Sequence, residues 1–124
     1  MSAPILIADP YVDFRELIAF DLQQRGYVVK EAHDGDAVLT LVARKPPCLL
    51  VLSAEIGPEG GVALATKLRE GRVRHFPIVM LTNGSSEKQI RASDLHLTAV
   101  LKKPFALDDL AKLVHLLAPS FPAN

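Results

Sequence analysis

The strongest constraint on the fold is a regular alternation of short apolar runs with longer amphipathic segments. The runs are too short for helices, and four of them are almost continuously apolar, which is typical of parallel strands covered on both faces. The second run is closed by Lys30 and Glu31 and therefore indicates an edge strand. The five runs occupy residues 5–8, 27–29, 49–52, 78–81 and 99–101.

The segments between these runs carry apolar residues at helical spacing. Gly26 is expected to cap the first helix, Asp34 or Gly35 to begin the second, and a short helix is expected over about residues 86–93. Repeated strand–helix units predict an α/β fold with a doubly wound parallel sheet of five strands and five helices. The predicted inward-facing residues are Phe14, Leu17, Ile18 and Leu22; Val38, Leu41 and Val42; Gly61, Leu64, Ala65 and Leu68; and Leu107, Leu110, Ala111, Val114 and Leu117.

Composition narrows the possible functions. The 124 residues predict one domain over residues 1–118, with a loose tail over residues 119–124. Lys and Arg together equal Asp and Glu at 14 each, so we expect no direct binding to nucleic acid and no attraction to a membrane surface. No apolar run approaches the roughly 20 residues of a membrane span, and the single Cys48 forms no internal disulfide. These features predict a cytoplasmic protein.

Polar residues follow the predicted strands, where a doubly wound sheet places its functional crevice. Asp9 and Pro10 follow the first strand, and Ser53 follows the third. Thr82 follows the fourth strand and Lys103 the fifth. We therefore expect these side chains to meet at one end of the sheet.

At these positions the chain resembles a receiver domain of the two-component response regulators. The resemblance runs from Ile5 to about Leu117, nearly the whole chain. It implies a flavodoxin-like sheet of order 2-1-3-4-5 and a cis peptide bond between Lys103 and Pro104. The segments that carry it are ILIADPYVDFRELI, GYVVKEAHDGDAV, PPCLLVLSAEIGPEGG, FPIVMLT and VLKKPFALDDL.

The resemblance also implies a phosphoryl-transfer site, from which this sequence departs. The family uses an aspartate after the third strand as phosphoryl acceptor and Mg²⁺ held by that aspartate and an acidic pair after the first strand. Here Ser53 takes the acceptor position, and Pro10 replaces the second acid beside Asp9. Thr82 and Lys103 match the family's phosphoryl contacts. Elsewhere in the chain, Val100 replaces the family's aromatic switch residue.

These departures predict a pseudo-receiver that is not an enzyme and has no cofactor. A serine hydroxyl is a poor nucleophile without a base. Mg²⁺ needs several oxygen ligands, and Lys103 can neutralise Asp9 directly. Glu55 and Glu59 are weak substitute carboxylates, because a loop acid is more often solvated. Thr82 and Lys103 are expected to hydrogen-bond Asp9 and Ser53 instead of a phosphoryl group.

Protein partners are the expected ligands. Leu113 and Leu116 extend the apolar face of the last helix, and we expect them to form the partner surface; the alternative is that they widen the core contact of this helix. The resemblance suggests a histidine kinase, an output protein or a second copy of this chain. Two alternatives stay open: a receiver still phosphorylated by a histidine kinase or at Ser53, Thr82 or Asp9, and a small-ligand sensor using the same crevice.

Overall fold

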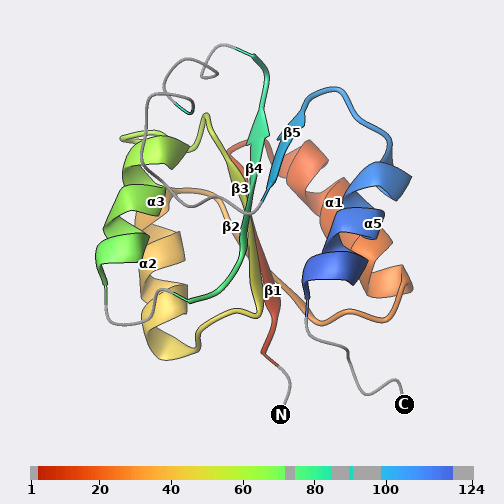
Figure 1. Cartoon of the computed structure of the whole chain (residues 1–124), viewed down its shortest axis with the longest axis horizontal. Coiled ribbons are helices and arrows are strands. Elements are labelled where there is room, and N and C mark those ends of the chain that lie inside the picture. Colours follow the sequence, from red (N-terminus) through yellow and green to blue (C-terminus); the bar gives the residue numbers. More distant parts are fainter. Residues whose placement is uncertain (1–2, 72–74, 85–89, 91–98, 119–124) are drawn as a thin grey trace.

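The computed structural model describes residues 3–71, 75–84, 90 and 99–118. A parallel sheet lies between two layers of helices (Figure 1). The described elements are, in chain order, β1 (Ile5–Ala8), α1 (Val12–Gln24), β2 (Val29–Ala32), α2 (Gly35–Arg44), β3 (Leu49–Ser53), α3 (Gly61–Glu70), β4 (Ile78–Thr82), β5 (Ala99–Lys102) and α5 (Leu107–Leu117).

The sheet has the predicted order β2-β1-β3-β4-β5, and every neighbouring pair is parallel. β2 is an edge strand, as Lys30 and Glu31 predicted, and β5 forms the other edge. β1, β3 and β4 are buried along their whole length, which explains their continuous apolar sequences. All the strands therefore end at the same edge of the sheet, at the top of Figure 1.

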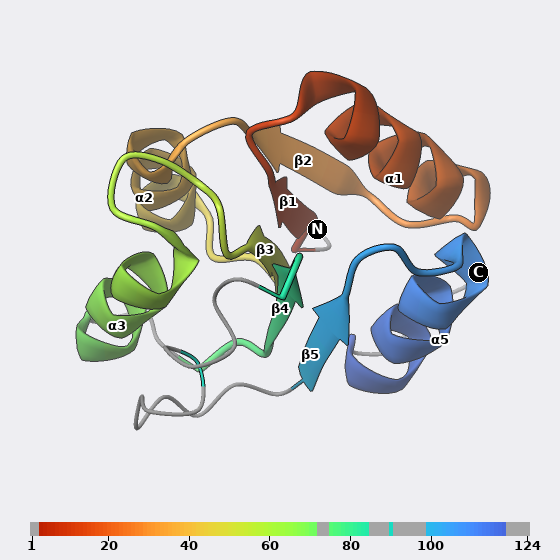
Figure 2. The same cartoon turned by 90° about the horizontal axis from the view of Figure 1, so that it is seen from above.

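Of the four helices whose bounds are described, two cover each face of the sheet. α2 and α3 lie on one face, and α1 and α5 lie on the other (Figure 2). Successive residues of a strand point to opposite faces. Accordingly, Leu6 and Ala8 belong to the apolar cluster beneath α2 and α3, whereas Ile5 and Ile7 belong to the cluster beneath α1 and α5.

The local signals for the ends of helices are confirmed. Asp34 is the N-cap of α2, and its side chain accepts a hydrogen bond from the backbone N–H of Ala37. Gly26 follows the C-cap of α1 with φ +100°, a backbone conformation that glycine adopts without strain. The Lys103–Pro104 bond is cis, as predicted. Among the described residues, no helix combines the length and apolar character needed to cross a membrane.

The predicted inward faces of α2, α3 and α5 are buried or partly buried. The prediction for α1 is wrong at Leu17, which is 52% exposed. Ile18, Ala19 and Leu22 form the buried face of α1, and Leu17 lies about 100° around the helix from Ile18. The helix predicted over residues 86–93 and the tail over residues 119–124 lie outside the described residues, apart from Ile90, which is helical.

Candidate functional site

The carboxyl ends of the strands bring four of the predicted residues to one edge of the sheet. Asp9 directly follows β1, Ser53 ends β3, and Thr82 ends β4; all three are buried. β1 and β4 both pair with β3, so these strand ends lie side by side. Lys103 follows β5, and its backbone N–H donates to the carbonyl oxygen of Thr82 at 2.7 Å.

The ammonium group of Lys103 is the centre of this site. Its Nζ lies 3.0 Å from Asp9 Oδ2, 3.3 Å from Ser53 Oγ and 3.4 Å from Glu55 Oε1. Three oxygen acceptors match the three N–H donors of a lysine ammonium group. Lys103 therefore binds groups of the protein itself at the point where the strand ends meet.

Asp9 is held from both sides. Its side chain is fully buried; Oδ1 accepts a hydrogen bond from the backbone N–H of Tyr11 at 2.7 Å, and Oδ2 accepts from Lys103. Arg15 donates to the backbone carbonyl of Asp9 and forms an ion pair with Glu31. A buried carboxylate is tolerated when it is paired and hydrogen-bonded, and Asp9 meets both conditions.

Two aromatic rings cover the Lys103 ammonium group and were not predicted as site residues. Nζ lies 4.4 Å from the ring centre of Phe14 and 5.5 Å from that of Tyr11. The negative faces of aromatic rings attract a cation at such distances. Phe14 also packs edge-on against Phe105, two residues after Lys103. The one signal in the sequence was the close spacing of Tyr11 and Phe14 after Asp9.

Glu55 points into the site, although the sequence favoured a solvated position for this loop carboxylate. Its Oε1 accepts from Ser53 Oγ at 3.4 Å as well as from Lys103. Its Oε2 is buried and has no hydrogen-bond partner among the described residues. Glu59, the other weak candidate, lies apart in an exposed ion pair with Lys67. Among the described residues, the site thus contains one ammonium group and two carboxylates, those of Asp9 and Glu55.

Thr82 does not make the predicted contact with Asp9 or Ser53. Its hydroxyl oxygen accepts a hydrogen bond from the backbone N–H of Gly84 at 3.0 Å, which closes the turn after β4. Short hydroxyl side chains commonly bond the backbone two residues further on. Pro10 lies at the site with no polar side-chain group, and Val100 is exposed on the edge strand β5.

The first residue of α3 touches the backbone beneath the site. A Cβ atom added at Gly61 would lie 2.6 Å from the carbonyl oxygen of Ser53 and 2.9 Å from the Cα atom of Ala54. The backbone N–H of Gly61 donates to the carbonyl of Ala54. Gly61 therefore lets the start of α3 pack directly on the end of β3, a role that its place in the apolar stripe did not indicate.

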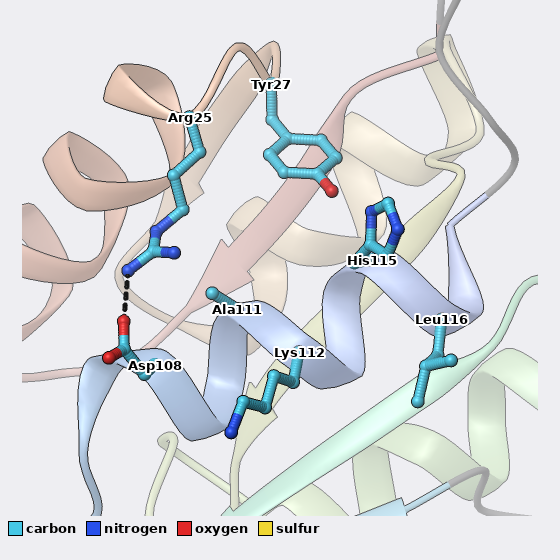
Figure 3. Close-up of a pocket in the computed structure, with 7 residues that line it drawn as sticks. All are labelled: Arg25, Tyr27, Asp108, Ala111, Lys112, His115 and Leu116. Carbon is cyan, nitrogen blue, oxygen red and sulfur yellow. Dashed lines mark hydrogen bonds and ion pairs between the residues drawn. The ribbon is translucent and has the colours of Figure 1, made fainter.

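The two residues proposed for a partner surface separate in the structure. Leu113 is partly buried and packs against the core beneath α1 and α5, whereas Leu116 is 76% exposed. Leu116 lines a groove of about 510 Å³ between α5 and the segment that follows α1. In Figure 3, Arg25 and Tyr27 form one wall of this groove, and α5 forms the other.

One end of the groove is closed by an ion pair. Arg25 donates to Asp108 at 2.7 Å, and this hydrogen bond lowers the pKa of the Asp108 carboxyl (Figure 3). At the other end, Leu116 lies beside His115 on α5. The groove therefore places an exposed apolar side chain next to charged and polar groups.

Both a family model and solved structures match this chain. The family model described as "Response regulator receiver domain" matches residues 5–115. Among solved structures, chemotaxis protein CheY4 of Vibrio cholerae has a TM-score of 0.83 and 25% identity, covering 94% of this chain and 99% of that one. The receiver domain of NtrX from Brucella abortus has a TM-score of 0.80 and 25% identity, covering 91% and 96%.

Curated relatives show the same similarity over part of their length. Response regulator MprA of Mycobacterium tuberculosis is 34% identical over 126 aligned residues, covering all of this chain and 54% of that protein. The phosphate regulon transcriptional regulatory protein PhoB of Escherichia coli is 30% identical over 112 residues, covering 89% and 49%. The chain thus spans about half the length of these relatives.

Proposed function

Because this chain belongs to the response regulator receiver domain family of two-component signal transduction, we propose that it is an atypical receiver. It signals by binding protein partners, without aspartyl phosphorylation and without acting as an enzyme. Ser53 occupies the position that corresponds to the family's phosphoryl acceptor, so the chain has no carboxylate there to form an acyl phosphate.

The observation that carries this proposal is the set of bonds around Lys103. In the family this lysine contacts the phosphoryl group; here its ammonium group binds Asp9, Ser53 and Glu55. An incoming phosphoryl group would have to displace these contacts, and it would meet the negative charge of Glu55. The protein's own carboxylates therefore supply the charge that a phosphoryl group would otherwise bring to Lys103.

We further infer that the crevice does not take up Mg²⁺. Both carboxylates already bind Lys103, and Pro10 contributes no oxygen ligand from its side chain. In the part of the chain that the structure describes, no three His, Cys, Asp or Glu side chains are grouped to hold a metal. Mg²⁺ requires near-octahedral coordination by oxygen atoms. Glu55 Oε2 has no hydrogen-bond partner among the described residues, but one such oxygen does not supply that coordination.

Phosphorylation of Ser53 itself is the rival function. Glu55 accepts a hydrogen bond from the Ser53 hydroxyl, which is the position of a general base. However, Ser53 is fully buried, and its Oγ also accepts a hydrogen bond from Lys103. A phosphoryl donor cannot approach this oxygen unless the loop that carries Glu55 opens. We therefore favour a structural role for Ser53.

Intact mass after incubation with acetyl phosphate, with and without Mg²⁺, tests the loss of phosphorylation. We expect no added phosphoryl group on the unmodified chain or on Ser53→Asp. Ser53→Asp still has Pro10 where the family has a metal-binding acid, and it places a third carboxylate beside Lys103. Pro10→Asp combined with Ser53→Asp should gain one phosphoryl group in the presence of Mg²⁺.

Two results would contradict this proposal. Stoichiometric phosphorylation of the unmodified chain, abolished by Ser53→Ala, would establish the rival function. Stoichiometric, Mg²⁺-dependent phosphorylation of the single Ser53→Asp variant would show that the site lacked only its acceptor. In either case the binding of protein partners would have to be explained together with phosphorylation.

We place the partner contact at the groove that Leu116 lines. A charged side chain there should prevent an apolar contact without disturbing the core, because Leu116 is exposed. Leu113 is left unchanged, since its partly buried side chain packs against the core. The expected partner is a histidine kinase, an output protein or a second copy of this chain.

The measurement compares Leu116→Glu with Phe20→Glu, a matched change at another exposed apolar residue, on α1. Partner proteins captured from the native host and the mass of the chain in solution are recorded for both variants. Leu116→Glu should lose the captured partner or the dimer, and Phe20→Glu should retain it. If only Phe20→Glu loses binding, the partner surface is on α1 and the assignment to the α5 groove is wrong.

A further inference from the structure

A second pocket lies at the opposite end of the sheet from the crevice, near the lower end of α2 in Figure 1. Its volume is about 250 Å³. Among the described residues, the apolar part of its lining is formed by Pro4, Leu6, Leu41 and Pro47. Its remaining described residues are the cations Lys30, Arg44 and Lys45.

The topology explains why these cations meet over an apolar floor. Lys30 of β2 is in register with Leu6 of β1, so both side chains lie on the face of the sheet that α2 covers. Arg44 ends α2, and Lys45 follows it directly. The three cations therefore come from an edge strand and from the end of a helix, and they gather around the buried side chain of Leu6.

In the part of the chain that the structure describes, these cations lack the acidic partners that several other cations have. Arg15, Arg25, Lys67 and Lys103 each form an ion pair with a carboxylate. Within the described ranges, Lys30, Arg44 and Lys45 form no ion pair or side-chain hydrogen bond, and no acidic residue lines the pocket. Because the chain has equal numbers of acids and bases, this positive cluster is a local feature and not an overall excess.

Helix electrostatics explains only part of the cluster. A cation in the last turn of a helix is favoured by the partial negative charge of the helix C-terminus, which accounts for Arg44 and Lys45. It does not account for Lys30 on the neighbouring strand. Three like charges around one pocket repel one another, and a bound anion would relieve that repulsion.

We propose that this pocket binds a small organic carboxylate with an apolar body. The carboxylate of the ligand would lie among the ammonium groups of Lys30 and Lys45 and the guanidinium group of Arg44. Its apolar body would cover Leu6 and Leu41. A volume of 250 Å³ equals that of about eight water molecules and lies below the roughly 300 Å³ at which drug-sized sites begin. A bicyclic aromatic acid such as 2-naphthoate has suitable size. This inference is independent of the proposed partner binding.

The test is a titration of the ¹⁵N-labelled chain with three probes, followed by amide chemical shifts. 2-Naphthoate carries both features, 2-naphthalenemethanol keeps the body without the charge, and acetate keeps the charge without the body. We expect 2-naphthoate to shift the amide signals of Leu6, Lys30 and Leu41 and to bind at least tenfold more tightly than either other probe. The affinity should fall between 20 mM and 500 mM salt, because the charges at the rim are exposed.

Matched variants locate the site. Lys30→Gln should weaken binding of 2-naphthoate about fivefold, and the triple change of Lys30, Arg44 and Lys45 to Gln should abolish it. Lys67→Gln removes an equal charge from an exposed position on α3, outside this pocket and outside the groove around Leu116, and should leave the affinity unchanged. Because all four cations are exposed, the variants should keep the fold, which thermal melting checks.

Three results would overturn the proposal. Equal affinity for the neutral alcohol would show that the cations do not contribute. Shifts confined to the crevice around Ser53 or to the groove around Leu116 would place the ligand elsewhere. An equal loss of affinity in Lys67→Gln would show that 2-naphthoate responds to the overall charge of the chain and not to this pocket.

Discussion

Replacing Lys103 by Met tests whether this lysine is the main support of the crevice. Met keeps much of the apolar stem and can pack on the Phe14 ring, so the change removes mainly the charge. Asp9 would then be a fully buried carboxylate with one N–H donor among the described residues, that of Tyr11. Its neighbour Glu55 would lose the same cation.

The size of the effect follows from the burial of these groups. Removing one partner of a buried ion pair costs about 3–5 kcal/mol, because the other charge stays buried without compensation. The Lys103 side chain is 16% exposed, and Glu55 lies on a loop that can turn towards water, so we expect the lower value. A loss of about 3 kcal/mol corresponds to a fall in Tm of about 12 °C for a domain of this size.

Urea unfolding followed by circular dichroism measures the free energy of unfolding. Lys67→Met is the matched control, because its ion pair with Glu59 is about half exposed on both sides and should contribute less than about 1 kcal/mol. Asp9→Asn combined with Lys103→Met removes both charges and should recover about half of the lost stability. If Lys103→Met costs no more than Lys67→Met, the crevice is not held together by this buried charge.

Three further predictions concern packing, capping and the thiol. Gly61→Ala should destabilise the chain by about 2 kcal/mol, because the added Cβ would meet the carbonyl of Ser53; Gly57→Ala, with open space around it, should cost less than half as much in the same urea assay. Asp34→Ala should cost about 1 kcal/mol by removing the N-cap of α2, and an unchanged urea midpoint would refute this. Burial raises the pKa of the Cys48 thiol, so maleimide at pH 8 should modify the folded chain at least tenfold more slowly than the urea-unfolded chain. The same shift makes the free energy of unfolding depend on pH. Its contribution is complete below about pH 8.5, the usual pKa of a thiol, and is lost as the pH rises through the pKa of the folded state.

Much of the fold could be read from local pattern. The length and composition of the apolar runs predicted the parallel sheet, and the charged end of the second run predicted an edge strand. The resemblance to the receiver family predicted the strand order and the positions of Asp9, Ser53 and Lys103 at one edge. These predictions hold because all strands of a parallel sheet point in one direction, so the residues that follow the strands lie at the same end of the sheet.

The sequence by itself thus determined the sheet, its edges and the residues available at its carboxyl end. Only the tertiary structure decided which of those residues contact one another. Asp9 and Lys103 are 94 residues apart in the chain, and no local rule reports that distance in space. Glu55 turns inward because Lys103 is there to bind it, and the Thr82 hydroxyl oxygen accepts from the backbone N–H of Gly84 in the turn after β4. Side chains on loops adopt the orientation that their final neighbours favour, and those neighbours exist only once the whole sheet has assembled.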